Sequence, residues 1–339
     1  METNDDQECC GSGCTNCVLD LKPSRHKLPT GVTNLFDRTY QPFVCCSIVQ
    51  QADDVFRFTF RMDTSSHDPS NNHRLIVPPG CHLLLRAPKT LNRSEHSADN
   101  QLVLWRQQHP VHQVVDRVPT NEMEKYDKNE EDLYFSRPYT PVAHNHEAAT
   151  FEVLIKMEAG GKMTQYLLTL SIGSTTEWKG VYGDFQWRRN QYPNVVGFVQ
   201  GVAIAPVYST MRAILDDDED YTRLTLCACF RDLENVLLRD ELQSMAGYWN
   251  FKYETYLSRR SCSCLQDEAG SCSCIAKRKK YNEPIYDRRL DAKDIARLMA
   301  PFSEKINSPP LVLLCGTDSF TTFIKSNLVK LGIENCYIF

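Results

Sequence analysis

The chain has 339 residues, of which 38 are Lys or Arg and 43 are Asp or Glu, so its formal net charge at pH 7 is −5. This length predicts two domains, and the mildly acidic charge argues against nucleic-acid binding. No run approaches the ~18 consecutive apolar residues of a membrane span, and the acidic N-terminus resembles neither a signal peptide nor a transit peptide. We therefore expect a soluble intracellular protein without an intrinsic membrane span, either cytoplasmic or else mitochondrial or peripheral to a membrane.

Two segments, the tail 1–36 and a later insertion at 259–285, are rich in cysteine, which makes up 15 residues of the chain. The first cluster consists of Cys9, Cys10, Cys14 and Cys17, and the second of Cys262, Cys264, Cys272 and Cys274. In an intracellular chain such thiols are reduced or bind a metal. Four close thiolates could hold zinc or an iron–sulfur cluster, but the adjacent pair Cys9 and Cys10 strains a tetrahedral site. We therefore favour a tail without metal and a reduced loop in the insertion.

Residues 37–190 predict an antiparallel β-barrel or sandwich. Short runs with the composition of strands occur at 44–49, 55–60, 83–85, 151–157 and 175–178. Strands of this length and spacing are typical of antiparallel sheets. One helix is expected at 163–170. The polar stretch 87–132 is too long for an ordinary loop of a compact domain and is predicted to be a surface insertion.

Residues 191–339 follow a different pattern, in which apolar runs alternate with segments of helical spacing. The expected strands are 195–204, 222–230, 250–257, 311–315 and 336–339, and the expected helices are 207–215, 234–247, 291–302 and 319–330. This alternation predicts a doubly wound parallel sheet with helices, an α/β domain. The acidic run 216–220 is expected to end a helix and face solvent. The basic run 277–280 is either a solvated loop or a docking surface for an acidic electron acceptor.

Two short motifs carry the groups that a dinucleotide needs. Arg137 and Tyr139 alternate on a predicted strand and therefore project from one face, so the guanidinium could bind a diphosphate while the phenol covers an aromatic ring. Thr140 adds a hydroxyl at the edge of that ring. The glycines 160–161 precede a helix start at Met163, where free backbone N–H groups favour an anion. Each motif also has an ordinary explanation, as an ion-paired Arg, a packed Tyr and a β-turn.

Taken together in chain order, the motifs resemble NADH–cytochrome b5 reductase-like flavoproteins of the ferredoxin–NADP reductase superfamily. The matching pieces are Pro78–His82, Arg137–Thr140, Gly161–Thr164, Gly201–Pro206, Cys315–Gly316 and Cys336–Phe339. The resemblance covers residues 37–339, and the cysteine tail is similar to the short oxidoreductase-like segment at the front of some members. A pure interaction module without cofactor would require the Arg137–Thr140 and Gly161–Thr164 motifs to be coincidental.

The resemblance implies an FAD-binding barrel followed by a domain for NADH or NADPH. Hydride would pass from NAD(P)H to FAD, and electrons would leave to a one-electron acceptor, a haem protein similar to cytochrome b5. Thr140 and Cys315 are the implied catalytic residues, near the reactive flavin nitrogen and the nicotinamide. The implied FAD-binding residues are Arg137, Pro138, Tyr139, Thr140, Leu154, Lys156, Gly161, Lys162, Met163 and Thr164. The implied nucleotide-binding residues are Gly201, Pro206, Ser258, Arg259 and Gly316.

The sequence departs from the family pattern at the nucleotide site. The family turn reads roughly G-G-T-G-I-T-P, and this chain has Gln200-Gly201-Val202-Ala203-Ile204-Ala205-Pro206. After Gly316 it has Thr317-Asp318-Ser319 in place of a proline run, and Asp318 would repel a phosphate unless it points away. These changes leave an alternative, a flavin- or metal-binding scaffold with weak or no reductase activity. Ser258 and Arg259 stand where NADH-preferring relatives carry an acidic residue, which favours NADPH.

Overall fold

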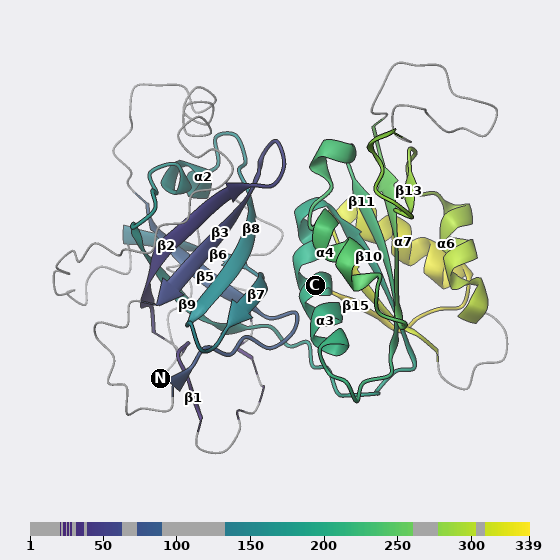
Figure 1. Ribbon diagram of the computed structural model, residues 1–339, viewed down its shortest axis with the longest axis horizontal. Coiled ribbons are helices and arrows are strands. Elements are labelled where there is room, and N and C mark those ends of the chain that lie inside the picture. Colours follow the sequence, from purple (N-terminus) through teal and green to yellow (C-terminus); the bar gives the residue numbers. More distant parts are fainter. Residues whose placement is uncertain are drawn as a thin grey trace. The chain divides into compact units, whose positions relative to one another are not determined.

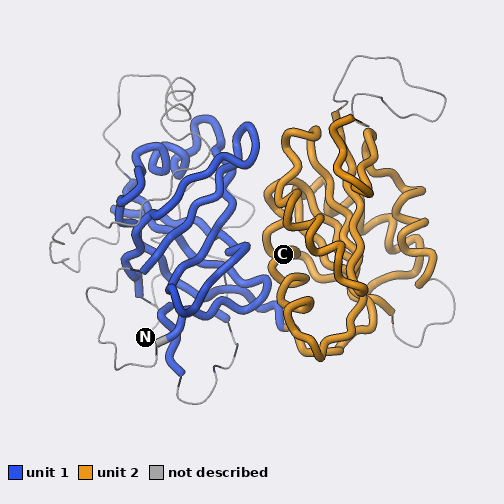
Figure 2. Tube along the Cα trace, viewed as in Figure 1, with its two compact units in different colours: residues 1–186 blue, residues 187–339 orange. Residues whose placement is uncertain are grey.

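The computed structural model describes residues 32–36, 39–62, 73–89, 133–259, 277–302 and 309–339, together with the single positions 21, 23, 24, 26 and 28. The chain forms two compact units, Met1–Gln186 and Trp187–Phe339 (Figure 2). The first cysteine cluster, the second cysteine cluster and most of the expected 87–132 insertion lie outside the described residues. In the described part of the chain, no helix is long and apolar enough to cross a membrane.

Unit 1 is built on a seven-stranded antiparallel sheet with the order β6-β5-β9-β2-β3-β8-β7 (Figure 1). The strands are β2 (Gln41–Gln50), β3 (Val55–Met62), β5 (His82–Pro88), β6 (Tyr134–Tyr139), β7 (Pro141–Asn145), β8 (Thr150–Lys156) and β9 (Thr175–Tyr182). A short parallel pair, β1 (Thr33–Asn34) and β4 (His73–Arg74), and the helix α2 (Lys162–Leu167) complete the described part of the unit. The edge strands β6 and β7 are separated only by Thr140, so the sheet must curl until its two edges meet, as in a barrel.

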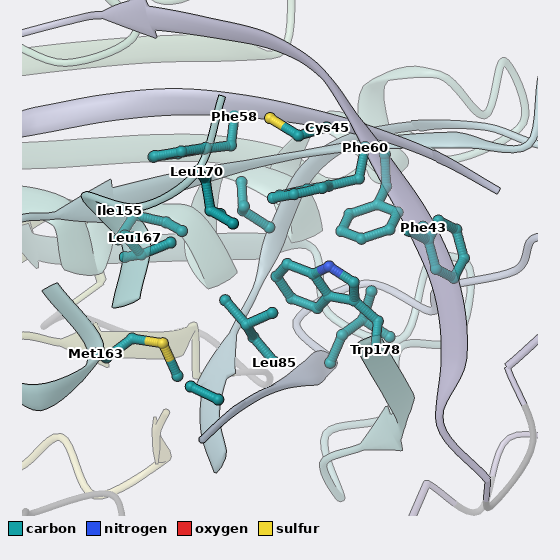
Figure 3. Packing of buried hydrophobic residues seen from close by; sticks show 14 of the residues in the cluster. Phe43, Cys45, Phe58, Phe60, Leu85, Ile155, Met163, Leu167, Leu170 and Trp178 are labelled. Carbon is teal, nitrogen blue, oxygen red and sulfur yellow. The ribbon is translucent and has the colours of Figure 1, made fainter. Parts of the chain in front are cut away.

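Aromatic side chains fill the inside of this sheet. In β3, Phe56, Phe58 and Phe60 are fully buried, while the intervening residues are only partly covered, as the two-residue period of a strand requires. Trp178 lies at the centre of the cluster, with its ring 4.9 Å from those of Phe60 and Phe151 (Figure 3). Its indole N–H donates to Thr176 Oγ1 at 3.0 Å, so the one polar atom of the side chain is satisfied.

Unit 2 is a six-stranded parallel sheet with the order β13-β12-β11-β10-β14-β15. The strands are β10 (Asn194–Gln200), β11 (Arg223–Phe230), β12 (Phe251–Leu257), β13 (Ile285–Tyr286), β14 (Leu311–Cys315) and β15 (Cys336–Ile338). Helices α3 (Ile204–Leu215) and α4 (Arg239–Met245) cover one face, and α6 (Ala292–Met299) and α7 (Asp318–Lys330) cover the other (Figure 1). The strand order reverses between β10 and β14, which is where open α/β sheets bind ligands.

Glycine 197 allows α3 to pack closely on β10. A Cβ at Gly197 would lie 2.7 Å from Val207 Cγ1 and 2.9 Å from Met211 Cε, so even a methyl group would force the helix away. The middle of the strand, residues 195–199, is apolar and buried, as expected for a strand covered on both faces.

The structure corrects several boundaries expected from the sequence. The apolar run 195–204 is not one strand, because β10 ends at Gln200 and a 3₁₀ turn over Gly201–Ala203 leads into α3. The expected helix 234–247 is shorter, since it begins at Arg239 after Leu238, which has a left-handed conformation (φ 55°). The expected helix 163–170 ends at Leu167, and 291–302 is α6 followed by a 3₁₀ turn. The hydrophobic periodicity of a sequence does not indicate where such turns begin.

The acidic run differs from expectation at one residue, and the basic run makes contacts that the sequence did not predict. Asp220 does not face solvent with the rest of its acidic run: it is buried, accepting from Trp187 Nε1 at 2.8 Å and from Thr222 Oγ1 at 2.6 Å. The basic run lies at the surface, with Lys277 and Arg278 exposed, and three of its four charges have partners within unit 2. Arg278 pairs with Glu234, Lys280 pairs with Asp240, and Lys279 donates to the carbonyl of Ile285. The basic run therefore presents less net charge to a partner than its sequence indicates.

Candidate functional site

The Arg137–Thr140 motif lies where the two edges of the unit 1 sheet meet. Arg137 and Tyr139 occupy alternate positions of β6, opposite Leu85 and Leu83 of β5, so they project from one face as predicted from their spacing. Thr140 is the single residue between β6 and β7 and is half-buried. Pro138, which faces the other way, is paired with Leu84.

Packing fixes the Tyr139 ring and keeps its phenol neutral. The ring meets Trp178 edge-on, with 6.0 Å between centroids. Burial raises the pKa of Tyr139 above its usual value, and the nearby Arg137 charge offsets only part of this effect. The Arg137 guanidinium lies 6.0 Å from the Phe135 ring. A rigid, uncharged phenol next to a guanidinium can accommodate an aromatic ring and a diphosphate of one ligand.

The second FAD motif follows β8 on a tight glycine turn. Gly160 has φ +72°, and Gly161 is the N-cap of α2 without a side-chain cap. The Gly161 N–H donates to the carbonyl of Glu158 at 3.0 Å, so a ligand would be bound by the N–H groups of the first helical turn. Lys162 is exposed, whereas Met163 and Thr164 are buried, and Met163 belongs to the barrel core. Met163 can therefore contribute its backbone, but not its side chain, to a diphosphate site.

The two β8 positions differ in what they offer. Leu154 is buried, while Lys156 is exposed and bonded to Glu158 Oε1 at 2.6 Å. Lys156 Nζ is thus accessible to an incoming anion. Binding an anion would break only the exposed ion pair with Glu158, which contributes little to stability.

Unit 2 contains a cavity of about 370 Å³ at the carboxyl ends of its strands. It opens beside β10, β11 and β12 and at the first turn of α7. The lining residues are Gln200, Cys229, Tyr256, Ser258, Arg289, Leu290, Ser319, Phe320 and Phe323. The aromatic side chains suit a flat base and the arginine suits an anion, a combination that fits the adenosine half of a nicotinamide dinucleotide.

The turn after β10 keeps the glycine conformation despite its substitutions. Gly201 has φ +59°, and a Cβ there would meet nothing within 4 Å, so the glycine is required by its backbone and not by crowding. Ala203 and Ala205 occupy the 3₁₀ turn and the start of α3, and Pro206 is buried in the first turn of that helix. The two alanines are therefore accommodated without loss of the strand–turn–helix geometry.

On the other side of the switch point, Cys315 ends β14 as a neutral thiol. Burial raises its pKa to about 12, and its Sγ lies 3.9 Å from the carbonyl oxygen of Phe339. The protonated thiol is a weak nucleophile, so its predicted place near the nicotinamide agrees with a packing contact and not with covalent catalysis. Gly316 follows, and Asp318 is exposed in the first turn of α7.

The guanidinium beside Ser258 comes from a residue that sequence analysis missed. Ser258 lines the cavity, and its backbone carbonyl accepts from Arg289 Nε at 3.4 Å. Arg289 lines the same cavity, whereas the predicted Arg259 is exposed next to Ser258 and does not. Because 31 residues separate Ser258 from Arg289, only the pairing of β13 with β12 brings them together.

An ionic network under the cavity holds Arg289 in place through its neighbour. Arg288 donates two bonds to the buried Asp294, at 2.5 and 2.7 Å, and Asp294 is part of the capping box that begins α6. The Arg288 guanidinium also lies 5.5 Å from the ring of Tyr256, which lines the cavity and donates to Glu254 Oε2 at 2.8 Å. Tyr256 and the neighbour of Arg289 are therefore part of one network of contacts.

Within the described residues, no group of three or more His, Cys, Asp or Glu side chains is placed to bind a metal. The metal hypotheses for Cys9, Cys10, Cys14 and Cys17 stay predictions, because these residues lie outside the described part of the chain.

Comparisons with known proteins match each unit to a domain family. The oxidoreductase FAD-binding domain family matches residues 122–187, and the oxidoreductase NAD-binding domain family matches residues 199–266. A human protein named NADH-cytochrome b5 reductase-like is 27% identical over 352 aligned positions, which cover 97% of this chain and 91% of the human one. NADH-cytochrome b5 reductase 2 of Lodderomyces elongisporus is 32% identical over a third of the chain and 37% of its own length.

Solved structures share the fold. The cytochrome b5 reductase domain of Ulva prolifera nitrate reductase superimposes with a TM-score of 0.62 at 18% identity, covering 91% of this chain and all of that one. A ferredoxin NADP+ reductase from Neisseria gonorrhoeae, with bound FAD and NADP, superimposes with a TM-score of 0.57 at 12% identity, covering 89% and 99%.

The fold and the two matched domains define an oxidoreductase that binds FAD and a nicotinamide nucleotide. Over nearly its whole length the chain is similar to the proteins named NADH-cytochrome b5 reductase-like, and its fold is that of the solved reductases.

Proposed function

We propose that this protein passes a hydride from NAD(P)H to FAD and then single electrons to a haem protein of the cytochrome b5 kind. The observation that carries the proposal is the nucleotide cavity at the switch point of unit 2, in a chain whose other unit has the FAD fold. The acceptor is inferred from the human relative, which is named NADH-cytochrome b5 reductase-like and aligns over nearly the whole chain.

The residues of unit 1 would bind and orient the flavin. Arg137 and the backbone at the start of α2 would bind the diphosphate, and the neutral ring of Tyr139 would lie against the cofactor. The Thr140 hydroxyl would donate near the reactive flavin nitrogen. When bound, FAD supplies the redox chemistry, since it accepts a hydride and releases electrons one at a time. The contribution of the protein is orientation, which makes the transfer between the two bound rings effectively unimolecular.

We also propose that NADPH is used at least as well as NADH. Ser258 and Arg289 line the adenosine side of the cavity together, and a serine hydroxyl with a guanidinium binds a 2′-phosphate better than a bare ribose hydroxyl. Arg259 and Arg231 lie next to this pair, with the Arg259 amide bonded to the Arg231 carbonyl at 2.7 Å. Arg231 is itself paired with Asp232 at 3.2 Å, which reduces its contribution.

The first experiment is a visible spectrum of the purified protein before and after anaerobic addition of NADH or NADPH. The expected result is a flavin spectrum that bleaches, followed by reduction of added ferricytochrome b5. Bleaching without haem reduction would reject the acceptor but keep the reductase. A flavin spectrum that never bleaches would favour the scaffold alternative and direct attention to Ala203 and Ala205.

The nucleotide proposal is tested by Arg289→Met. Loss of one charged hydrogen bond should lower kcat/KM for NADPH about tenfold and leave kcat/KM for NADH nearly unchanged. Arg259→Met should have a smaller effect, and Arg223→Met, an exposed position at the opposite end of the sheet, is the matched control. A strong NADH preference in the parent protein that neither Arg289→Met nor Arg259→Met alters would refute the proposal.

A further inference from the structure

Two departures from the family pattern are in direct contact across the switch point. Gln200 stands where the family turn has its first glycine, and Thr317 stands where the family has proline. Gln200 Oε1 accepts from Thr317 Oγ1 at 2.8 Å and from Thr317 N at 3.3 Å, although 117 residues separate them. The end of β10 is thereby tied to the start of α7.

The contact also fixes which way the Gln200 amide faces. A backbone N–H can only donate, so the atom of Gln200 that meets Thr317 N must be the oxygen. The amide nitrogen Nε2 then lies on the other arm of the carboxamide. Among the described residues the structure gives Nε2 no partner, and the Gln200 side chain lines the nucleotide cavity. A donor of this kind is held ready for an acceptor.

Thr317 is itself held by the helix it begins. It is the N-cap of α7, and its Oγ1 accepts from Phe320 N at 3.4 Å and lies 3.2 Å from Ser319 Oγ. Gly316 leaves room for this arrangement, because a Cβ there would lie 3.1 Å from Gln200 Cβ and 2.6 Å from Phe320 Cδ1. The position of the Gln200 amide is thus set by a helix cap and a glycine, and not by solvent.

We propose that Gln200 is a nucleotide-positioning residue, whose Nε2 donates to a ribose or phosphate oxygen of the nicotinamide dinucleotide while Thr317 holds its oxygen. In the family turn, glycine lets the nucleotide approach the backbone closely. In this chain the side chain occupies that space and supplies a donor in its place. The inference rests on nucleotide binding alone and is independent of the electron acceptor.

Two substitutions, Gln200→Glu and Gln200→Leu, distinguish the role of the amide nitrogen from that of the amide oxygen. Gln200→Glu keeps an acceptor for Thr317 but replaces the donor by a second, negatively charged oxygen. Gln200→Leu removes both arms without adding charge. The binding of NADP+ and NAD+ to the FAD-loaded full-length protein is measured by isothermal titration calorimetry. Gln191→Glu, an exposed position just before β10 and therefore at the opposite end of the sheet, is the matched control.

We expect Gln200→Glu to raise the Kd for either nucleotide more than tenfold, because a lost hydrogen bond and a new repulsion add. Gln200→Leu should raise it about three- to tenfold, and Thr317→Val, which releases the amide, by a smaller factor. Wild-type affinity in Gln200→Leu would overturn the proposal even if Gln200→Glu binds weakly, because charge alone would then explain the glutamate variant. Tighter binding in Gln200→Leu would show that the side chain obstructs the site.

A second measurement separates positioning from a general structural effect. In stopped-flow reduction of the flavin, the nucleotide concentration at half-maximal rate should rise in Gln200→Leu, with the limiting rate within about twofold of wild type. An unchanged half-saturation with a reduced limiting rate would contradict nucleotide binding by Gln200. A melting temperature equal to that of wild type ensures that Thr317→Val reports on the amide and not on fraying of α7.

Discussion

The two units differ in the kinds of polar side chain that they bury. In unit 1, the buried polar side chains among the described residues are hydroxyls, those of Ser136, Thr164 and Thr176, and the core is a cluster of aromatic rings. In unit 2, the carboxylates Asp220, Glu283 and Asp294 are buried, and each accepts hydrogen bonds. A barrel encloses a single core, which aromatic side chains can fill. A parallel sheet is covered by helices on both faces, and polar networks hold the loops at its ends.

The candidate site residues of the two units also lie on different kinds of element. The FAD residues of unit 1 lie on strands, at the start of α2 and at the seam of the sheet, where Tyr139 packs against the edge of the aromatic core. The nucleotide residues of unit 2 lie in turns after strands, where buried ion pairs hold the loops. We therefore expect apolar changes to damage unit 1 most, and changes of charge or pH to act mainly through unit 2.

The largest effect should come from Trp178→Ala. Removal of a fully buried aromatic side chain from the centre of the barrel should lower the free energy of unfolding by about 3–5 kcal/mol and weaken FAD binding, because the Tyr139 ring packs against this indole. Calorimetric unfolding and the flavin content of the purified protein measure the two effects. Trp249→Ala makes the same change at a side chain that is 70% exposed in unit 2 and should alter stability by less than about 0.5 kcal/mol. Equal effects of the two variants would contradict the comparison.

Asp294→Asn should have the next largest effect, with a dependence on pH. Burial raises the pKa of Asp294, but the hydrogen bonds from Arg288 and from the Asp291 backbone outweigh it, so the pKa in the folded protein lies below its usual value. The ionised carboxylate therefore stabilises the fold above the pKa of the unfolded chain, and this contribution disappears as the pH falls through the lower, folded pKa.

At neutral pH, Asp294→Asn should lower the free energy of unfolding by about 1.5–3 kcal/mol, the range for hydrogen bonds to charged groups. The difference from wild type should become smaller at acidic pH. Urea unfolding at several pH values measures it, with the exposed Asp218→Asn as control. A difference in the free energy of unfolding that grows as the pH falls would contradict a lowered pKa of Asp294.

Lys280→Met should have the smallest effect. Lys280 pairs with Asp240, whose side chain is 86% exposed, and exposed pairs contribute at most about 1 kcal/mol. Because the charge is already compensated, the rate of haem reduction at low salt should also change little. A large fall in that rate, with stability unchanged, would restore the interpretation of the basic run as a docking surface.

Much of the fold was predictable because it depends on local patterns. The two-residue alternation in β3 and the continuous apolar run of β14 identify their sheets directly. The apolar run 195–204 misled because a strand and the helix after it are both buried, so hydrophobicity does not mark the turn between them. Asp220 was misplaced because its partners, Trp187 and the turn before β11, meet it only in the folded chain.

The site was predictable to the extent that its residues form contiguous motifs. Arg137–Thr140 and Gly161–Thr164 are short segments whose groups lie together on any barrel of this topology. Arg289 and the Gln200–Thr317 contact are different, because each depends on which strands are neighbours. No local signal pointed to them. Gln200 and Thr317 are both departures from one family pattern and lie at the ends of neighbouring strands, β10 and β14, and such pairs of departures could be sought in other chains.

The single residue between β6 and β7 has a consequence for how this protein can change in length. With only Thr140 joining the two edges of the sheet, the junction has no slack, and an added or deleted residue would shift one strand by one position and turn its side chains to the opposite face. Arg137 and Tyr139 would then exchange places with Ser136 and Pro138. The flavin-binding side of the barrel is thus specified by a count of residues as well as by their identity, and insertions compatible with function must fall elsewhere in the chain.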